Sequence, residues 1–355
     1  MAARLAASSL LPGGARGARA VGVAAALLAV LALALGIDGA PVVLIGSLPY
    51  PGAVAIDGPH AYVTNHDLSV SYQAPEGDRR WGASNLFEVP VAGGASRRLV
   101  TLSGQPITDI AVGPSTLYFT CAGGGTVSSL SLATLQIHPI ASGQQEPWAI
   151  AVDRTHVYFT TRGLRDHVDG TVVRVSAAGG PLEVIASGLR APMYLALDDA
   201  NVYVTVLGGR APDYRDSAIL VIPKQGGRPV VLAAEQDAVR GLAADGASIY
   251  WTSTGKGPAY GQVFRLDRAG GRPVVLAAGE QSPTALAIDQ ESVFWTCSRG
   301  TVRRVGKEGG RPTTLASGQD RPVHIAVGPA AVVWSNYGKA DGETDLPGGL
   351  MALRR

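Results

Sequence analysis

The residues best suited to acid–base chemistry are few, and they lie at the starts of short apolar segments or in the loops that follow them. His324 and Asp109 each stand near the start of such a segment, and His66-Asp67 opens a long polar loop. An imidazole titrates near physiological pH and can exchange a proton with a substrate, so proton transfer is the chemistry that these residues could perform. A lone His at a strand start is more often a partly buried polar residue, so the four remain secondary candidates. The sequence contains no phosphate loop, dinucleotide fingerprint, metal-spaced Cys/His cluster or nucleophile elbow.

These candidates belong to copies of one repeated pattern. Each copy has a short apolar strand, a tight polar turn, and a second strand that in most copies ends on Tyr or Phe, one further residue, and Thr. Internal repetition fixes the architecture before any other interpretation. The seven copies are Pro51–Asn65, Ile107–Cys121, Pro147–Thr160, Pro192–Val206, Val239–Ser253, Pro283–Cys297 and Pro322–Asn336. Ala occupies one place in all seven, which indicates strands crowded around a narrow axis.

Two more strands separate consecutive copies. One has the pattern GTVVRVSA (Gly170–Ala177), and the other has the pattern GGRPVVLAA, which occurs at Gly226–Ala234 and again at Gly270–Ala278. The Gly-Gly pair between them suits a hairpin, because Gly tolerates positive φ. Four short strands in about 45 residues are the signature of a propeller blade. The sequence therefore predicts an all-β fold, a seven-bladed β-propeller with four antiparallel strands per blade.

The two ends of the repeated region complement each other. The chain finishes on a third strand, Gly348–Arg355, with no fourth strand after it, and Gly39–Ser47 (GAPVVLIGS) matches the missing strand. We therefore expect the N-terminal strand to complete the last blade, which closes the ring and leaves no open sheet edge between the ends. Residues 39–355 would then form one propeller domain, which we expect to be monomeric.

The N-terminal segment differs in composition from the rest of the chain. Residues 1–34 hold Arg4, Arg16 and Arg19 and no acid, and an apolar run extends from Ala20 to Leu35. This layout predicts that residues 1–38 are a signal peptide or an N-terminal membrane anchor, and that the protein is exported to the periplasm, cell surface or extracellular space. Contact with a membrane is expected only through this segment, if it is uncleaved. The remainder has 27 basic and 28 acidic residues and no Lys/Arg run, so no nucleic-acid partner is expected.

The two cysteines, Cys121 and Cys297, lie at equivalent places in the second and sixth copies. In a seven-bladed ring those places face each other across the axis, on the order of 20 Å apart given strands ~4.8 Å from one another. A disulfide requires Cα atoms within about 7 Å. We therefore predict two unpaired thiols.

The long loops fall on one face of the predicted ring. In a four-stranded meander the second-to-third-strand loops share a face with the connections between blades, and these loops carry the insertions. Function concentrates in loops held by a rigid scaffold, and interfaces are enriched in aromatic residues and Arg. Packing of the same rings onto the blades is the alternative. The predicted binding residues are, in the loops, Tyr72, Trp81, Arg165, Tyr214, Arg215, Tyr260 and Tyr337, and, at the channel mouth, Trp148, Tyr194 and Arg240.

Two rings of residues precede the Ala position and surround the channel mouth on the looped face. Among these fourteen residues Asp109 is the single carboxylate. A hard cation prefers several oxygen ligands, so we predict no metal site and no cofactor. The Asp that ends most first strands (Asp57, Asp153, Asp198, Asp245, Asp289) is interpreted as turn chemistry, because an Asp side chain caps the backbone two residues on.

The segment Leu242–Thr252, with Leu-Ala-x-Asp followed by Tyr250-Trp251-Thr252, resembles the YWTD propeller repeat of the LDL-receptor family and its bacterial exported relatives. The resemblance extends through the repeat over residues 39–355. The chain departs from that family in having no Asp after the Thr position and in seven copies where six blades are typical. The receptors of that family use the propeller to bind proteins. From the one-sided insertions rich in Tyr and Arg we predict a non-enzymatic, exported propeller that binds a protein or glycan through its looped face. The alternative is a propeller lyase or lactonase that acts on a small molecule at the channel mouth.

Overall fold

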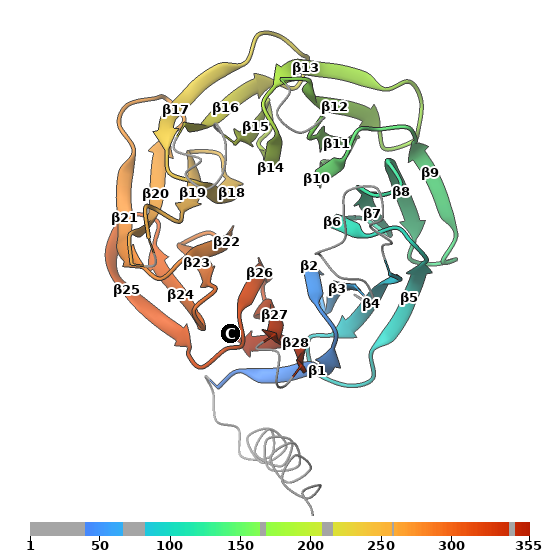
Figure 1. Ribbon diagram of the computed structural model, residues 1–355, viewed down its shortest axis with the longest axis vertical. Helices are drawn as coiled ribbons and strands as arrows, with labels where there is room; N and C mark the ends of the chain where they lie inside the picture. Colours follow the sequence, from blue (N-terminus) through green and yellow to red (C-terminus); the bar gives the residue numbers. More distant parts are fainter. Residues whose placement is uncertain (1–39, 67–81, 164–167, 208–215, 258, 341–344) are drawn as a thin grey trace, which may run out of the picture.

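The structure is a computed structural model that describes residues 40–66, 82–163, 168–207, 216–257, 259–340 and 345–355. These residues form 28 strands in seven antiparallel sheets of four strands each. Figure 1 shows the sheets arranged radially around a central axis, with the first strand of each blade innermost and the last strand on the rim. The seven-bladed propeller predicted from the repeat is confirmed.

The blades follow one another in chain order, and the strand bounds repeat closely. Blade 1 has β2 (Pro51–Asp57), β3 (His60–His66), β4 (Ser84–Pro90) and β5 (Arg97–Leu102). Blade 2 has β6 (Ile107–Gly113), β7 (Thr116–Cys121), β8 (Thr126–Ser131) and β9 (Ile137–Ala141). Blade 3 has β10 (Pro147–Val152), β11 (His156–Thr161), β12 (Gly170–Ser176) and β13 (Glu183–Leu189). Blade 4 has β14 (Pro192–Leu197), β15 (Asn201–Val206), β16 (Ser217–Pro223) and β17 (Val230–Gln236).

The last three blades complete the ring. Blade 5 has β18 (Val239–Ala244), β19 (Ser248–Ser253), β20 (Gly261–Asp267) and β21 (Val274–Glu280). Blade 6 has β22 (Pro283–Ile288), β23 (Ser292–Cys297), β24 (Thr301–Gly306) and β25 (Gly309–Ala316). Blade 7 has β26 (Pro322–Val327), β27 (Ala331–Ala340), β28 (Asp345–Arg354) and, as its outermost strand, β1 (Val42–Leu48).

Strand β1 closes the ring as predicted. It pairs antiparallel with β28, with Val42 opposite Ala352 and Val43 opposite Met351. Figure 1 shows the first and last described strands side by side in one sheet. Leu48 and Leu350 are buried in the core that blades 7 and 1 share. The N-terminal strand therefore joins the two ends of the propeller in one sheet.

Every first strand carries a β-bulge close to its start. In each blade the register of the first strand against the second shifts by one residue, for example between Pro147↔Thr161 and Ile150↔Phe159. A bulge places two residues of one strand opposite one residue of its partner. That one residue is the repeated Thr or Ser of the second strand. The bulge thus presents two successive residues of each blade at the channel mouth.

The repeated Thr hydroxyl stabilises the bulge and links neighbouring blades. Thr160, Thr205 and Thr296 each accept a hydrogen bond from a bulge amide of their own blade. Thr252 also donates to the carbonyl of Thr284 in the next blade at 2.9 Å. The regular recurrence of Thr in the sequence therefore has a specific cause: a buried bulge amide needs an acceptor.

The hydrophobic core is divided into seven clusters that lie between adjacent blades. Each cluster combines residues of two neighbouring blades; six of the seven include aromatic second-strand residues, and the cluster between blades 7 and 1 has Ala and Val there instead. Tyr250, Trp251, Phe294 and Trp295 are at most 2% exposed. Their interpretation as core residues is confirmed, and so is the prediction of unpaired thiols, since Cys121 and Cys297 are both free and buried.

The Asp that ends most first strands caps its turn, as predicted, and also joins two blades. Asp198 accepts hydrogen bonds from the amides of Ala200 and Asn201 at 2.7 Å each. Its other oxygen accepts from the hydroxyl of Tyr203 and forms an ion pair with Nε of Arg268 in the next blade at 2.9 Å. Equivalent ion pairs are Asp153–Lys224, Asp245–Lys307 and Asp289–Arg355. We call these four the inter-blade ion pairs.

The inter-blade ion pairs occur at regular positions in the sequence. The cation is always the residue after the third strand, whose backbone amide donates to a turn carbonyl of its own blade. Where the preceding blade has Gly113 or Gly328 in place of Asp, the equivalent residue is Ala177 or Val91. Asp57 is the exception, because Leu132 occupies the cation position next to it. Turn capping and blade-to-blade pairing are therefore separate functions of the same Asp.

Asp198→Asn should lower the free energy of unfolding by about 2–3 kcal/mol at pH 7, because Asn keeps the turn acceptor but loses the charged bonds to Tyr203 and Arg268. Burial by itself raises the pKa of Asp198, but the hydrogen bonds from Tyr203 and the two amides, with the charge of Arg268, outweigh it and hold the pKa below its ordinary value. This stabilisation is present above the unfolded pKa of about 3.9 and is lost as pH falls through the lower folded pKa. Urea unfolding at pH 7 and below pH 3 measures both effects.

The comparison variant is Asp57→Asn, which has no cation opposite and, because Pro59 stands two residues on, no backbone N–H there to cap. It should change the free energy of unfolding by no more than about 0.5 kcal/mol. An equal loss in both variants would show that neither the turn bonds nor the ion pair of Asp198 accounts for the effect.

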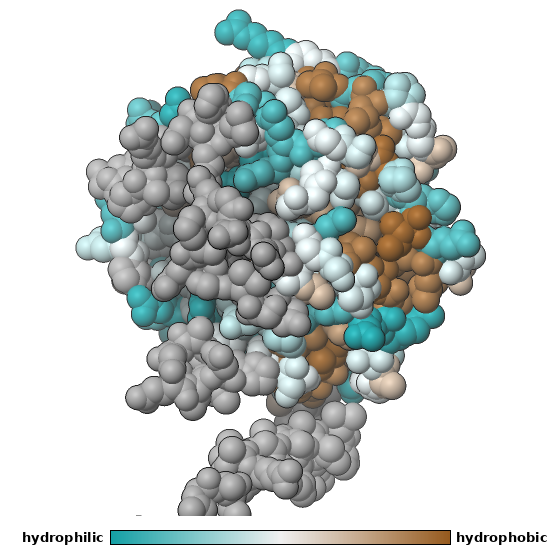
Figure 2. All heavy atoms as spheres, turned by 45° about the vertical axis from the view of Figure 1, so that its right-hand side comes forward, coloured by the Kyte–Doolittle hydropathy of each residue, from teal (hydrophilic) through white to brown (hydrophobic). Residues whose placement is uncertain are grey.

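The two faces and the rim of the ring differ in character. Tight first-to-second-strand turns such as Asp198–Asn201 lie on one face, and the longer second-to-third-strand connections lie on the other, as predicted. The outermost strands expose Val184, Val230, Val231, Val274 and Val275, and Figure 2 shows separate apolar patches interrupted by hydrophilic side chains. Among the residues that the structure describes, no helix is long and apolar enough to cross a membrane. The predicted leader, residues 1–38, lies outside the described residues.

Candidate functional site

The channel mouth on the looped face collects the polar and aromatic residues that the bulges present. Asp109 comes from β6, Trp148 from β10, Tyr194 from β14, Arg240 from β18 and His324 from β26, so five of the seven blades contribute. All five side chains are partly exposed. In the remaining blades the inner bulge residues are the small Ala53 and Ala285. These two blades flank blade 7, so His324 stands between two positions with small side chains.

Asp109 is held in place by backbone amides of two blades. Its Oδ1 accepts from the amide of Ile110 at 2.9 Å, and its Oδ2 accepts from the amide of Ile150 in β10 at 3.0 Å. Burial raises the pKa of Asp109 to about 7, although both amides act to lower it. At neutral pH this carboxyl is therefore close to the midpoint of its titration, and it can either donate or accept a proton.

Two histidines, His66 and His324, lie at the junction of blades 7 and 1. Burial lowers the pKa of His66 to about 4, and burial together with a smaller repulsion from His66 lowers the pKa of His324 to about 4. The Nδ1 atom of His66 is hydrogen bonded to Oγ of Ser84 at 2.9 Å. Both imidazoles are thus neutral at physiological pH, where each can accept a proton or bind as a hydrogen-bond partner.

Arginine stands over an aromatic ring at two places on the looped face, and at a third it is hydrogen bonded to a phenol. The guanidinium of Arg162 lies 4.6 Å from the ring centroid of Trp148, and that of Arg321 lies 5.0 Å from the ring centroid of Tyr337. Burial raises the pKa of Tyr194, while the charge and hydrogen bond of Arg240 oppose this shift, so Arg240 is within bonding reach of the phenol. An Arg over an aromatic face is a common unit of recognition surfaces.

The aromatic residues of the described loops support both interpretations, a binding surface and packing onto the blades. Tyr337 packs against Tyr50, with ring centroids 5.3 Å apart and planes inclined by 59°. Tyr260 is 68% exposed, and its contacts are within its own loop, where its amide donates to Gly257. Tyr337 is therefore partly a packing residue, whereas Tyr260 presents its ring to solvent.

The structure brings some of the predicted residues together and leaves others outside its description. Trp148, Tyr194, Arg240, Asp109 and His324 share the mouth, as expected from their common place in the repeat. Tyr72, Trp81, Arg165, Tyr214, Arg215 and Asp67 lie outside the described residues. Their place at a binding surface stays a prediction.

Residues that the sequence analysis did not single out also contribute to the mouth. Arg162 follows β11 directly, stands over Trp148 and pairs with Glu146 at 3.5 Å. Arg321 immediately precedes β26. Their position one residue outside a repeated strand was the available signal, because such residues must lie at the same face as the loops. Within the described ranges no group of three or more His, Cys, Asp or Glu side chains could hold a metal ion.

The class of protein that this fold and mouth define is a seven-bladed β-propeller with an aromatic and arginine-bearing looped face. No family model matches the chain, and no curated protein matches it. Among solved structures, the chain is similar to a catalytically inactive form of virginiamycin B lyase from Staphylococcus aureus with quinupristin, at TM-score 0.63 and 11% identity, covering 88% of this chain and 97% of that one. It is also similar to Kuenenia stuttgartiensis hydrazine synthase, at TM-score 0.65 and 12% identity, covering 87% and 96%.

A third similar structure is a nidogen/laminin complex, at TM-score 0.53 and 17% identity, covering 68% of this chain and 94% of that chain. At these identities the likeness establishes the fold alone. Propellers of this architecture thus occur both in an enzyme and in a protein–protein complex. The choice between these functions depends on the residues of the site.

Proposed function

We propose that this protein is an exported, non-enzymatic propeller that binds a protein or glycan partner through its looped face. The observation that carries the proposal is the set of aromatic rings with arginines at the channel mouth: Trp148 with Arg162, Tyr194 with Arg240 and Tyr337 with Arg321. Such pairs combine a broad apolar surface with directed N–H donors, which is the composition of binding hot spots and of platforms that stack on sugars.

The charge of the mouth indicates what kind of partner it accepts. Arg162, Arg240 and Arg321 bring three positive charges, while Asp109 is near its titration midpoint and both histidines are neutral. Glu146 offsets Arg162 in part. The face is therefore suited to a partner with acidic or hydroxyl-rich groups. The YWTD-like repeat and the predicted leader support export of such a binding module.

Replacing Trp148, Tyr260 and Tyr337 together with Ala should abolish partner capture while the melting temperature stays within a few degrees of wild type. Each hot-spot ring contributes about 2 kcal/mol or more to binding, so the triple variant should bind at least about 100-fold more weakly. Immobilised protein is used to capture proteins from an extract of the native cell envelope and, separately, is applied to a glycan array. The readout is the amount of each specifically retained partner.

The matched control is a triple variant of the rim, Val184→Ser, Val231→Ser and Val275→Ser, which removes a similar number of exposed apolar residues from another surface. It should capture the partner as the wild type does. If the mouth variant still captures the partner and the rim variant does not, the binding surface lies on the outer strands.

A second function, a lyase or lactonase at the same mouth, is favoured by one observation. A carboxyl with a pKa of about 7 and two imidazoles with pKa values of about 4 offer both a proton donor and proton acceptors at neutral pH. A screen of lactones and cyclic esters with wild type and His324→Ala tests it. Turnover that depends on His324 would establish this function in place of the first.

A further inference from the structure

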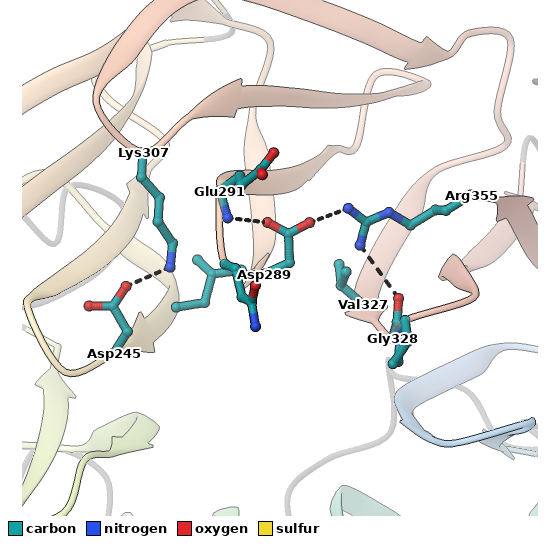
Figure 3. Close-up of a pocket in the computed structure, with 10 residues that line it drawn as sticks. Asp245, Asp289, Glu291, Lys307, Val327, Gly328 and Arg355 are labelled. Atoms are coloured by element: carbon teal, nitrogen blue, oxygen red, sulfur yellow. Dashed lines mark hydrogen bonds and ion pairs between the residues drawn. The ribbon is translucent and has the colours of Figure 1, made fainter.

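A second concave site lies on the opposite face, where the first turns of blades 5, 6 and 7 meet. Its volume is about 730 Å³, within the range of pockets that hold small molecules. Figure 3 shows that two inter-blade ion pairs form its walls: Lys307 points toward Asp245, and Arg355 points toward Asp289. None of these residues belongs to the channel mouth.

The pocket borders the first turn of blade 7, which lacks the Asp found at this place in blades 3 to 6. Blade 7 has Gly328-Pro329 in place of the usual Asp, so no carboxylate projects from its turn, and the guanidinium of Arg355 reaches the carbonyl of Gly328 at 3.5 Å. Ile288, Val327 and Pro329 supply apolar surface in the same pocket. The pocket is therefore bounded by two intact ion pairs and by the apolar residues Ile288, Val327 and Pro329.

Two charged groups can still contact a ligand although the ion pairs in the pocket walls are formed. The carboxylate of Glu291 is exposed, and no described residue pairs with it. The side chain of Arg355 is 32% exposed and has N–H groups beyond those directed at Asp289 and Gly328. By contrast, the side chain of Lys307 is only 12% exposed and is neutralised by Asp245 at 2.6 Å.

Glu291, through its backbone amide, and Arg355, through its guanidinium, are both bonded to the carboxylate of Asp289. Asp289 accepts a hydrogen bond from the backbone amide of Glu291 at 2.8 Å and forms an ion pair with Arg355 (Figure 3). The exposed Glu291 carboxylate and the Arg355 guanidinium thus line the same pocket as the apolar residues Ile288 and Val327. That arrangement complements a molecule with an ammonium, a carboxylate and a hydrophobic side chain.

We propose that this pocket binds a free α-amino acid with an apolar side chain. Its ammonium pairs with Glu291, its carboxylate accepts from Arg355, and its side chain packs against Ile288 and Val327. The site goes beyond the proposed partner binding and is independent of it, because it lies on the other face of the ring.

The chain contains its own comparison for this site. The position of Glu291 is occupied by Ala200 in blade 4 and by Ala247 in blade 5, and the amide of each makes the same bond to its turn Asp. Glu291→Ala therefore reproduces a turn that already folds elsewhere in the ring. The anionic group that recognises the ammonium is removed, while the inter-blade ion pairs stay intact.

The test is calorimetric titration of the purified protein with L-leucine, L-phenylalanine, N-acetyl-leucine and leucine methyl ester. We expect saturable one-to-one binding of leucine or phenylalanine. Either modified leucine, and either amino acid with the Glu291→Ala variant, should bind at least about tenfold more weakly, as expected from the loss of one charged hydrogen bond. The Trp148/Tyr260/Tyr337 variant should bind the amino acids as the wild type does.

Three results would overturn the proposal. The first is no saturable heat with either amino acid, and the second is undiminished binding to Glu291→Ala. The third is equal affinity for leucine and its methyl ester, because a site that does not distinguish them does not recognise the carboxylate.

Discussion

Removing residues 1–49, and with them β1 (Val42–Leu48), should yield a chain that fails to fold into a stable monomer. Blade 7 would keep only β26, β27 and β28, and the pairing of β1 with β28 would be lost. Leu350 and Ala352, now fully buried, would be exposed together with an unpaired strand edge. The cost exceeds about 5 kcal/mol, comparable to the whole stability of many domains, so aggregation is the expected outcome.

The control for this truncation is the chain that begins at residue 40, which keeps β1 and should be monomeric and fully folded. A synthetic peptide covering residues 40–49 should restore folding of the shorter chain when added during refolding, because it supplies the missing strand. Circular dichroism melting and size-exclusion chromatography measure both effects. A stable monomer from residues 50–355 without the peptide would contradict ring closure by β1.

The second large effect concerns a buried charge between blades 5 and 6. The side chain of Glu280 is 1% exposed and accepts a hydrogen bond from Nε1 of Trp295 at 2.9 Å. It also forms an ion pair with Arg303, which is opposite Trp295 in the next strand. Arg303→Met should lower the free energy of unfolding by about 3–5 kcal/mol, because it leaves a buried carboxylate without a cation.

The ring contains the uncharged version of this arrangement twice. Trp251 and Trp334 donate to Gln236 and Gln319, and the residues opposite these rings are Phe264 and Met351. The double variant Glu280→Gln, Arg303→Met reproduces the Gln and Met that surround the Trp of blade 7. Its free energy of unfolding should be within about 1 kcal/mol of that of the wild type. Glu280→Gln alone should cost about 2–3 kcal/mol, because Arg303 keeps some contact with water. A double variant as unstable as Arg303→Met would show that the pair does not act as a unit.

The repeat made the fold predictable from the sequence, because each copy contains the same strand and turn pattern. Alternation, Gly-Gly hairpins and Asp turns are local features, and seven repetitions leave a closed ring as the arrangement that satisfies all of them. The match between the two terminal strands also predicted closure. What the sequence did not reveal is which side chains meet across blades. Lys224 lies 71 residues from Asp153, and only the ring geometry places them in contact.

The candidate site was predictable to the same extent. Asp109, Tyr194 and His324 occupy one column of the repeat, so their convergence follows from the architecture. Arg162 and Arg321 were missed because they stand just outside the repeated strands. The pocket beside Glu291 was not predicted, because it is formed by the turns of three blades, which meet only in the folded ring.

The division of the ring into a binding face and a turn face is the central claim of this account, and hydrogen exchange with a captured partner tests it most directly. We predict slower amide exchange in the first residues of β10, β14, β18 and β26 and in the loops that share their face, with no change in the turns near Asp198, Asp245 and Asp289. Slower exchange confined to those turns, or to the outer strands, would contradict it.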